Sequence, residues 1–105
     1  MRIIFLGSRS GRSYIDDYLS RMSLEDRATI LAVFEDVQQH GFSAVGCNFR
    51  QIEGKLWEIK IAMHRLFYVL LDKNEMVVLH AYKKQGQKLP LREKEVALRR
   101  MKEMI

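Results

Sequence analysis

Cysteine and proline are almost absent from this chain of 105 residues, because each occurs once. With Cys47 alone, no disulfide can form within the chain and no cysteine-based zinc site is available. Apolar runs are short, and none approaches the roughly 18 residues of a membrane-spanning helix. The first run, residues 2–6, stops at Gly7 and is too brief for the core of a signal peptide. We therefore expect a cytoplasmic protein.

Motifs for metal or nucleotide chemistry are also missing. The three histidines, His40, His64 and His80, are scattered, with no paired acid at metal-ligand spacing. The sequence contains neither a GxxxxGKS/T phosphate loop nor a GxSxG nucleophile turn. We expect no metal site and no cofactor, so catalysis would have to rely on side chains and on groups of the substrate.

Positive charge is concentrated in the second half of the sequence. Residues 1–53 hold six Lys or Arg against seven Asp or Glu, whereas residues 54–105 hold twelve against six. The formal net charge of +5 therefore comes from the second half, which favours a polyanionic partner for that half. The alternative is a solvated basic surface without a partner.

Length and a hydrophobic content of 48% fit one domain that spans residues 1–105. Its first half predicts a strand at residues 2–6 and then two helices. The second helix begins after the N-cap Ser23, has acidic residues in its first turn and ends at Gly41. Apolar residues at helical spacing mark the buried faces of the two helices: Tyr14, Ile15, Tyr18, Leu19 and Met22 in the first, and Ile30, Leu31, Phe34 and Val37 in the second.

The second half predicts strands after a polar loop at about residues 42–54. Residues 56–61 alternate apolar and charged side chains, residues 66–71 are continuously apolar, and residues 76–82 form another apolar run. Short turns between them indicate an antiparallel meander. A terminal helix follows Pro90, with the apolar stripe Ala97, Leu98, Met101 and Ile105. The predicted fold class is α+β, in the order β-α-α-β-β-β-α, with two N-terminal helices packed on a small antiparallel sheet.

Basic and aromatic residues gather on these strands and on the loop after them. Lys60 ends one strand and Arg65 begins the next, so a hairpin places both at one end of the sheet, where Arg and Lys can hold a phosphate. An exposed tyrosine can stack on an unpaired base. The candidate set consists of Lys60, Arg65, Tyr68, His80, Tyr82, Lys83, Lys84 and Lys88.

RNA brings its own nucleophile, the 2′-hydroxyl, and can be cleaved without a metal ion. The protein must orient that hydroxyl, stabilise the phosphate and supply proton transfers. Arg65, Lys83 and Lys84 suit the electrostatic part, whereas His80 or Tyr82 can transfer a proton. The structural alternatives are that the cations cap the sheet edge or pair with acids, and that His80 is a core histidine.

Several segments together resemble the phage-derived branch of the RelE/HigB toxin superfamily. They are Leu-Trp-Glu at residues 56–58 within the segment 54–61, Arg-Leu-Phe-Tyr at 65–68, Leu-His-Ala-Tyr-Lys-Lys at 79–84, and Pro-Leu-Arg-Glu at 90–93. The resemblance covers essentially the whole chain. It implies a toxin of a type II toxin–antitoxin pair that cleaves mRNA on the ribosome and is neutralised by a small antitoxin, expected to be of helix-turn-helix type, in a hetero-oligomer.

The same resemblance implies roles for individual residues. Lys60 and Arg65 match strand positions that grip the scissile phosphate, and Lys84 matches the basic residue that ends the sheet. The sequence departs from RelE at Glu58, where RelE has another basic residue, and it has no tyrosine after the loop that follows Lys84. His64 stands where the family often has tyrosine.

Two other functions remain compatible with the sequence. A ParE-like protein would keep the fold and inhibit DNA gyrase by binding it. A non-catalytic accessory protein would bind nucleic acid without cleaving it. Lys60 and the pair Lys83–Lys84 favour the nuclease over the gyrase inhibitor.

Overall fold

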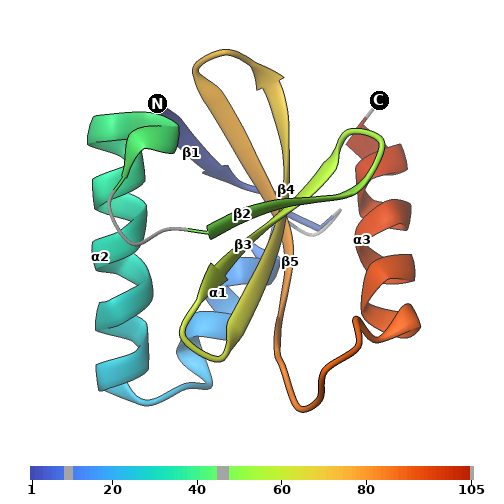
Figure 1. The fold of residues 1–105 in the computed structure, drawn as a ribbon, viewed down its shortest axis with the longest axis horizontal. Coiled ribbons are helices and arrows are strands. Elements are labelled where there is room, and N and C mark those ends of the chain that lie inside the picture. Colours follow the sequence, from blue (N-terminus) through green and yellow to red (C-terminus); the bar gives the residue numbers. More distant parts are fainter. Residues whose placement is uncertain (9–10, 45–47, 105) are drawn as a thin grey trace.

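The computed structural model describes residues 1–8, 11–44 and 48–104 (Figure 1). A five-stranded sheet runs through the molecule in the order β1-β5-β4-β3-β2. The elements along the chain are β1 (Arg2–Phe5), α1 (Tyr14–Ser20), α2 (Leu24–His40), a 3-10 turn (Gly41–Ser43), β2 (Asn48–Glu53), β3 (Leu56–Ile61), β4 (His64–Asp72), β5 (Glu75–Lys83) and α3 (Leu91–Met104). The α+β class and the order of the predicted elements are confirmed, with one strand added.

The added strand is β2, which occupies residues 48–53 of the segment predicted as a polar loop at residues 42–54. Strand β2 pairs antiparallel with β3 and has a register shift between Gln51 and Glu53. Its two apolar residues, Phe49 and Ile52, pack on opposite sides of the sheet. The strand therefore lacks the apolar–polar alternation that identifies a strand in a sequence. Cys47, in the same predicted loop, lies outside the described residues.

The sheet is mixed rather than wholly antiparallel. Strand β1 runs parallel to β5, with Ile3 opposite Met76 and Phe5 opposite Val78, whereas the other neighbouring strands are antiparallel. The three-stranded meander predicted from the short turns is present as β3, β4 and β5. Helices α1 and α2 connect β1 to β2. Although β1 is the first strand in the sequence and β5 the last, the two lie side by side in the sheet.

Helices α1 and α2 cover one side of the sheet, called here the α1/α2 face. Ile15 and Leu19 of α1 and Ile30, Phe34 and Val37 of α2 pack against buried sheet residues. Both helices have a serine N-cap. The hydroxyls of Ser13 and Ser23 each accept a hydrogen bond, at 3.1 Å, from a backbone N–H in the first turn of the helix. Gly41 ends α2 with a φ of 61°, a conformation that glycine adopts without strain.

Helix α3 alone covers the opposite side, called here the α3 face (Figure 1). Ala97 is fully buried there, and Leu98, Met101 and Met104 pack beside it. The predicted docking of the terminal helix is confirmed, although Ile105 of the expected stripe lies outside the described residues. On the sheet, the α3 face includes Leu56, Phe67, Val69, Val77, Leu79 and Tyr82. No helix in the described ranges is long and apolar enough to cross a membrane.

Candidate functional site

Three candidate residues form one row across the three inner strands of the sheet, β3, β4 and β5, near the β3–β4 turn. Lys60 of β3 lies opposite Arg65 of β4, and Arg65 lies opposite Tyr82 of β5. Residues directly opposite one another in a sheet project to the same side, here the α3 face, where Tyr82 belongs to the hydrophobic cluster. The expected meeting of Lys60 and Arg65 at the end of a hairpin is thus confirmed by the register.

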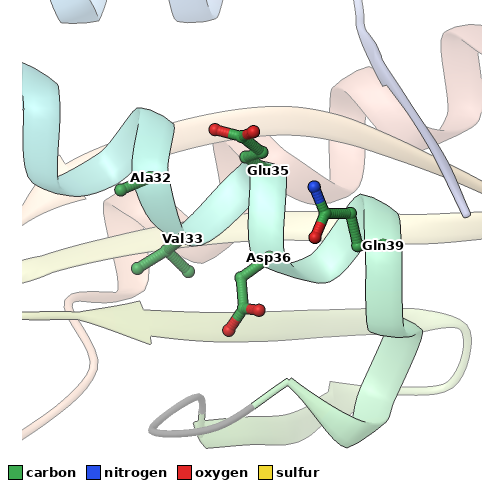
Figure 2. Close-up of a pocket in the computed structure, with 5 residues that line it drawn as sticks. All are labelled: Ala32, Val33, Glu35, Asp36 and Gln39. Atoms are coloured by element: carbon green, nitrogen blue, oxygen red, sulfur yellow. The ribbon is translucent and has the colours of Figure 1, made fainter.

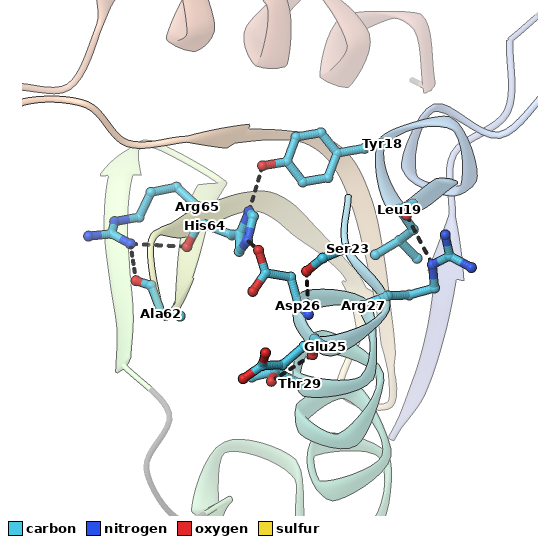
Figure 3. Close-up of polar contacts among 10 residues, drawn as sticks. All are labelled: Tyr18, Leu19, Ser23, Glu25, Asp26, Arg27, Thr29, Ala62, His64 and Arg65. Carbon is cyan, nitrogen blue, oxygen red and sulfur yellow. Dashed lines mark hydrogen bonds and ion pairs between the residues drawn. The ribbon is translucent and has the colours of Figure 1, made fainter. Parts of the chain in front are cut away.

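Arg65 is held in place by the turn between β3 and β4. It is 7% exposed, and its Nη1 donates hydrogen bonds to the carbonyls of Ala62 and His64 at 2.9 and 3.0 Å (Figure 3). Ala62 has a φ of 53°, which is rare for a residue with a side chain, so the turn benefits from this support. The guanidinium is a fixed, largely desolvated positive charge at this end of the sheet.

Lys84 lies beside the same turn. Its backbone N–H donates to the carbonyl of Met63 at 2.8 Å, which extends the β4–β5 pairing past the end of β5. In a pleated strand, side chains two residues apart share a side, so this geometry directs Lys84 toward the side of Tyr82. Lys83, opposite His64, belongs to the α1/α2 face. Lys60 and Lys83 are exposed, and Lys84 is half-buried.

The Tyr82 hydroxyl is buried and has no hydrogen-bond partner in the described residues. Its ring stacks on Phe67 with centroids 5.7 Å apart and is 6% exposed. Burial raises the pKa of Tyr82, and the carboxylate of Glu58 raises it further, whereas Arg65 and Arg50 lower it. Tyr82 is therefore a neutral phenol that can donate a proton in a hydrogen bond.

Two residues of this face were not among the sequence candidates. Glu58 of β3 is 4% exposed, and its Oε2 lies 3.0 Å from Nη2 of Arg50 on β2. The sequence places Arg50 in a loop because β2 has no clear strand pattern, so the cations that it offers as partners for Glu58 are Lys60 and Arg65, whereas the structure pairs Glu58 with Arg50. The signal in the sequence that could point to this pair is the carboxylate of Glu58 within a predicted strand, since a charge that becomes buried there needs a partner.

His80 uses both ring nitrogens within the protein. Arg100 Nη1 lies 3.1 Å from Nδ1, and because arginine only donates, Nδ1 accepts and the proton resides on Nε2. Nε2 then donates to Glu93 Oε1 at 2.8 Å. Burial lowers the pKa of His80, partly offset by its bond to Glu93. These contacts join β5 to α3, so the geometry favours the structural role of His80 over proton transfer.

Tyr68 does not belong to the candidate site. Its side chain is 1% exposed and packs on the α1/α2 face with Phe49 and Phe42. The prediction that Tyr68 stacks on a base is therefore not supported, because no face of the ring is open to a ligand. The continuous apolar run of β4 gave no indication of which side its tyrosine would take.

A cleft of about 1050 Å³ opens beside the C-terminal half of β5. Its lining includes four sequence candidates, His80, Tyr82, Lys83 and Lys88, together with Arg21. Lys60, Arg65 and Lys84 are not part of this lining. The cleft therefore meets the row on the sheet at Tyr82, and its lining adds the basic side chains of Arg21, Lys83 and Lys88.

The cleft also contains a polar chain that the sequence did not indicate. The Tyr18 hydroxyl and His64 Nδ1 share a hydrogen bond of 2.7 Å, and His64 Nε2 lies 3.5 Å from Asp26 Oδ2 (Figure 3). Burial, followed by the charge of Asp26, raises the pKa of Tyr18 to about 12. These residues come from α1, β4 and α2, and no spacing in the sequence relates them.

Another hollow lies on the outer surface of α2 (Figure 2). Its lining is Ala32, Val33, Glu35, Asp36 and Gln39, with two acids and no cation. Such a surface does not suit a phosphate. Among the residues whose positions are described, no group of three His, Cys, Asp or Glu side chains could hold a metal ion.

The fold and the residues on its sheet define the class of protein. A mixed five-stranded sheet has two helices on one face and a C-terminal helix on the other, with basic side chains gathered at one end. A family model described as "Phage derived protein Gp49-like (DUF891)" matches residues 17–102. The chain belongs to this family, which is a HigB-like toxin family of the RelE/ParE superfamily. No curated protein matches the chain significantly.

Proposed function

We propose that this chain is the toxin of a type II toxin–antitoxin pair and cleaves ribosome-bound mRNA without a metal ion. The observation that supports this function best is the row Lys60–Arg65–Tyr82, which gathers two cations and a neutral phenol on one side of the sheet. Lys84 adds a further cation beside the same turn. The whole chain, residues 1–105, acts as one domain in this proposal.

The row suits the charge changes of phosphodiester cleavage. When O2′ attacks, negative charge grows on the non-bridging phosphate oxygens, and preorganised cations stabilise that charge. Arg65 is already fixed by the turn carbonyls, so little reorganisation is needed. Lys60 and Lys84 add flexible ammonium groups, and Lys83 and Lys88 bind neighbouring phosphates along the cleft.

The partners in this proposal follow from the family and from the charge. A HigB-like toxin acts with an antitoxin, here expected to be a helix-turn-helix protein in a hetero-oligomer. The ribosome would position the mRNA, which supplies the orientation that a small site lacks. Both partners would be met in the cytoplasm.

Mapping of mRNA 5′ ends after induced expression tests the proposal. Wild type is compared with Lys60→Ala and Lys84→Ala, and Lys73→Ala is the matched control because Lys73 lies at the other end of β4 and β5, between Asp72 and Glu75. We expect new ends in phase with codons for wild type and Lys73→Ala, and a loss of about 100-fold in both site variants.

Two outcomes contradict the proposal. Equal cutting by wild type, Lys60→Ala and Lys84→Ala would remove the row from the mechanism. DNA damage without new mRNA ends would indicate a gyrase inhibitor. Thermal unfolding of each purified variant separates loss of activity from loss of fold.

A further inference from the structure

We propose that Glu58 and Tyr82 form a subsite for the ribose of the cleaved nucleotide, in which Glu58 accepts the proton of the 2′-hydroxyl. The inference rests on the function proposed above and adds the group that activates the nucleophile. The site residues described above do not supply such a group, because Lys60 and Arg65 are cations, Tyr82 is a neutral phenol and His80 is bound to Glu93 and Arg100. RelE has a basic residue where this chain has Glu58.

Hydrogen bonding on the α3 face is incomplete. Within the described part of the chain, two buried side-chain oxygens have no hydrogen-bond partner, Glu58 Oε1 and Tyr82 Oη. Folded proteins satisfy almost all buried polar groups, since an unpaired one loses its bonds to water without compensation. Here both unpaired atoms belong to the α3 face and flank the same residue, Phe67, which pairs with Glu58 and stacks on Tyr82.

The chemistry of the two atoms defines the ligand. A carboxylate oxygen only accepts a hydrogen bond, whereas a neutral phenol can donate one. A ribose offers both a hydroxyl donor and oxygen acceptors, and the 2′-hydroxyl distinguishes RNA from DNA. A phosphate alone would satisfy Tyr82 but would be repelled by Glu58, so the pair fits a sugar rather than another anion.

Arg50 is the cation that binds the carboxylate of Glu58 at the edge of the sheet. Its side chain is 56% exposed and holds Glu58 Oε2 at 3.0 Å from the edge strand β2. An arriving phosphate offers the guanidinium a bidentate partner of equal charge. When Arg50 turns toward that phosphate, it releases Oε2 of Glu58, so substrate binding and release of the base from its ion pair are coupled.

The chemical step balances without a co-reactant. Glu58 Oε1 removes the 2′-OH proton while O2′ forms a bond to phosphorus. The P–O5′ bond breaks, its electron pair stays on O5′, and O5′ takes a proton from a water molecule. Glu58 then returns its proton to the resulting hydroxide. The products are a 2′,3′-cyclic phosphate and a 5′-hydroxyl end, while Lys60 and Arg65 stabilise the charge on the phosphate.

The first test is single-turnover cleavage of mRNA on programmed ribosomes. Glu58→Gln preserves the shape and a hydrogen-bond acceptor for Arg50 but removes the base. The matched control is Glu53→Gln, since Glu53 is an exposed acid that pairs with Lys94 on α3. We expect Glu58→Gln to lose about 100-fold or more in rate, whereas the control keeps the rate of wild type.

The second test does not require cleavage. NMR titration compares the affinities of a short single-stranded RNA and its DNA counterpart for wild type, Glu58→Gln and Tyr82→Phe. We expect wild type to prefer RNA and both variants to lose most of that preference while retaining their affinity for DNA, because the phosphate-binding cations are unchanged.

The two tests separate this inference from the proposed function. If wild type cuts mRNA and Glu58→Gln cuts within twofold of Glu53→Gln, the inference fails and the function stands. If wild type makes no cuts but its preference for RNA depends on Glu58, the function fails and the ribose subsite stands. Equal affinity of wild type for RNA and DNA overturns the subsite.

Discussion

At the scale of single residues, the two histidines of the sheet, His64 (buried) and His80 (half-buried), face opposite sides. His64 faces the helices α1 and α2 and contacts Tyr18 and Asp26, whereas His80 faces α3 and is fixed between Glu93 and Arg100. Each imidazole therefore joins the sheet to helices that are distant in the sequence. The chemistry available to a histidine depends on which ring nitrogens its neighbours leave open, and both nitrogens of His64 and of His80 have partners within the protein.

We predict that His80 makes the stability of the fold sensitive to mild acid. Burial lowers the pKa of His80 from 6.5, so the unfolded chain binds the proton first. The contribution is complete above pH 6.5 and declines as the pH falls toward the lower folded-state pKa. His80→Gln should flatten the decline in unfolding free energy between about pH 7.5 and about pH 5.5, measured by urea unfolding.

The exposed His40 supplies the control for this measurement. His40 contacts Asp36 on its own helix, at 3.0 Å, so His40→Gln removes an imidazole and leaves in place the contacts that join His80 to α3. Cleavage by His80→Gln should fall less than about tenfold, since a proton-transfer residue typically contributes more than that. A loss as large as that of Glu58→Gln would instead assign proton transfer to His80.

We predict a second pH effect, on the alkaline side, from Tyr18. Its pKa is raised from 10.0 to about 12, so the folded state holds the phenol proton more tightly than the unfolded chain. The stabilisation is complete below pH 10 and is lost as the pH rises toward 12. Tyr18→Phe should be less stable at neutral pH and should lose stability less steeply between about pH 9.5 and about pH 11. A parallel decline in both proteins would contradict this assignment.

At the scale of elements, what the sequence predicted depended on the regularity of each pattern. The helices and the strands β3, β4 and β5 have apolar residues at helical spacing, alternation or continuous runs, and all were predicted. Strand β2 has only Phe49 and Ile52, on opposite faces, and its bulge disrupts the alternation further. Missing β2 also meant missing Arg50, and with it the cation that holds Glu58.

The sequence predicts the candidate site only as far as it predicts the pairing of the strands that carry its residues. Lys60 and Arg65 could be placed together because a short turn connects their strands, so local sequence fixes the pairing. Tyr82 joins them only through the pairing of β4 with β5, which contains a register shift after Phe67. Contacts such as Tyr18 with His64 span 46 residues and arise from packing, for which no local pattern exists.

We predict that the attachment of α3 depends strongly on Arg100. Its Nη1 donates to the carbonyl of Leu79 at 3.0 Å and contacts His80, and its guanidinium lies 3.4 Å above the ring centre of Tyr14. Arg100→Ala should lower the unfolding free energy by about 2 kcal/mol, as expected for hydrogen bonds from a charged donor, and speed amide exchange along α3. The neighbouring exposed Arg99→Ala should change stability by less than about 0.5 kcal/mol. Equal effects of the two variants would show that α3 is held by its apolar stripe alone.

At the scale of the whole molecule, the distribution of charge matters more than its sum. The acids of the first half gather largely on α1 and α2, as Asp16, Asp17, Glu25, Asp26, Glu35 and Asp36. The cations of the candidate site lie on β3, β4, the end of β5 and the segment after it. A polyanion is therefore attracted to one end of the sheet and repelled by the outer surface of the helices, which orients it before contact.

This arrangement predicts how binding to single-stranded RNA depends on salt. Each phosphate neutralised by the protein releases condensed counterions, so the logarithm of affinity falls against the logarithm of salt with a slope of about −0.7 per contact. With Lys60, Arg65 and Lys84 each at a phosphate, the slope should be about −2, and Lys60→Ala should make it shallower by about 0.7. Lys73→Ala removes the same formal charge at the far end of the sheet. If both variants change the slope equally, net charge governs binding; if only Lys60→Ala does, RNA contacts the proposed site.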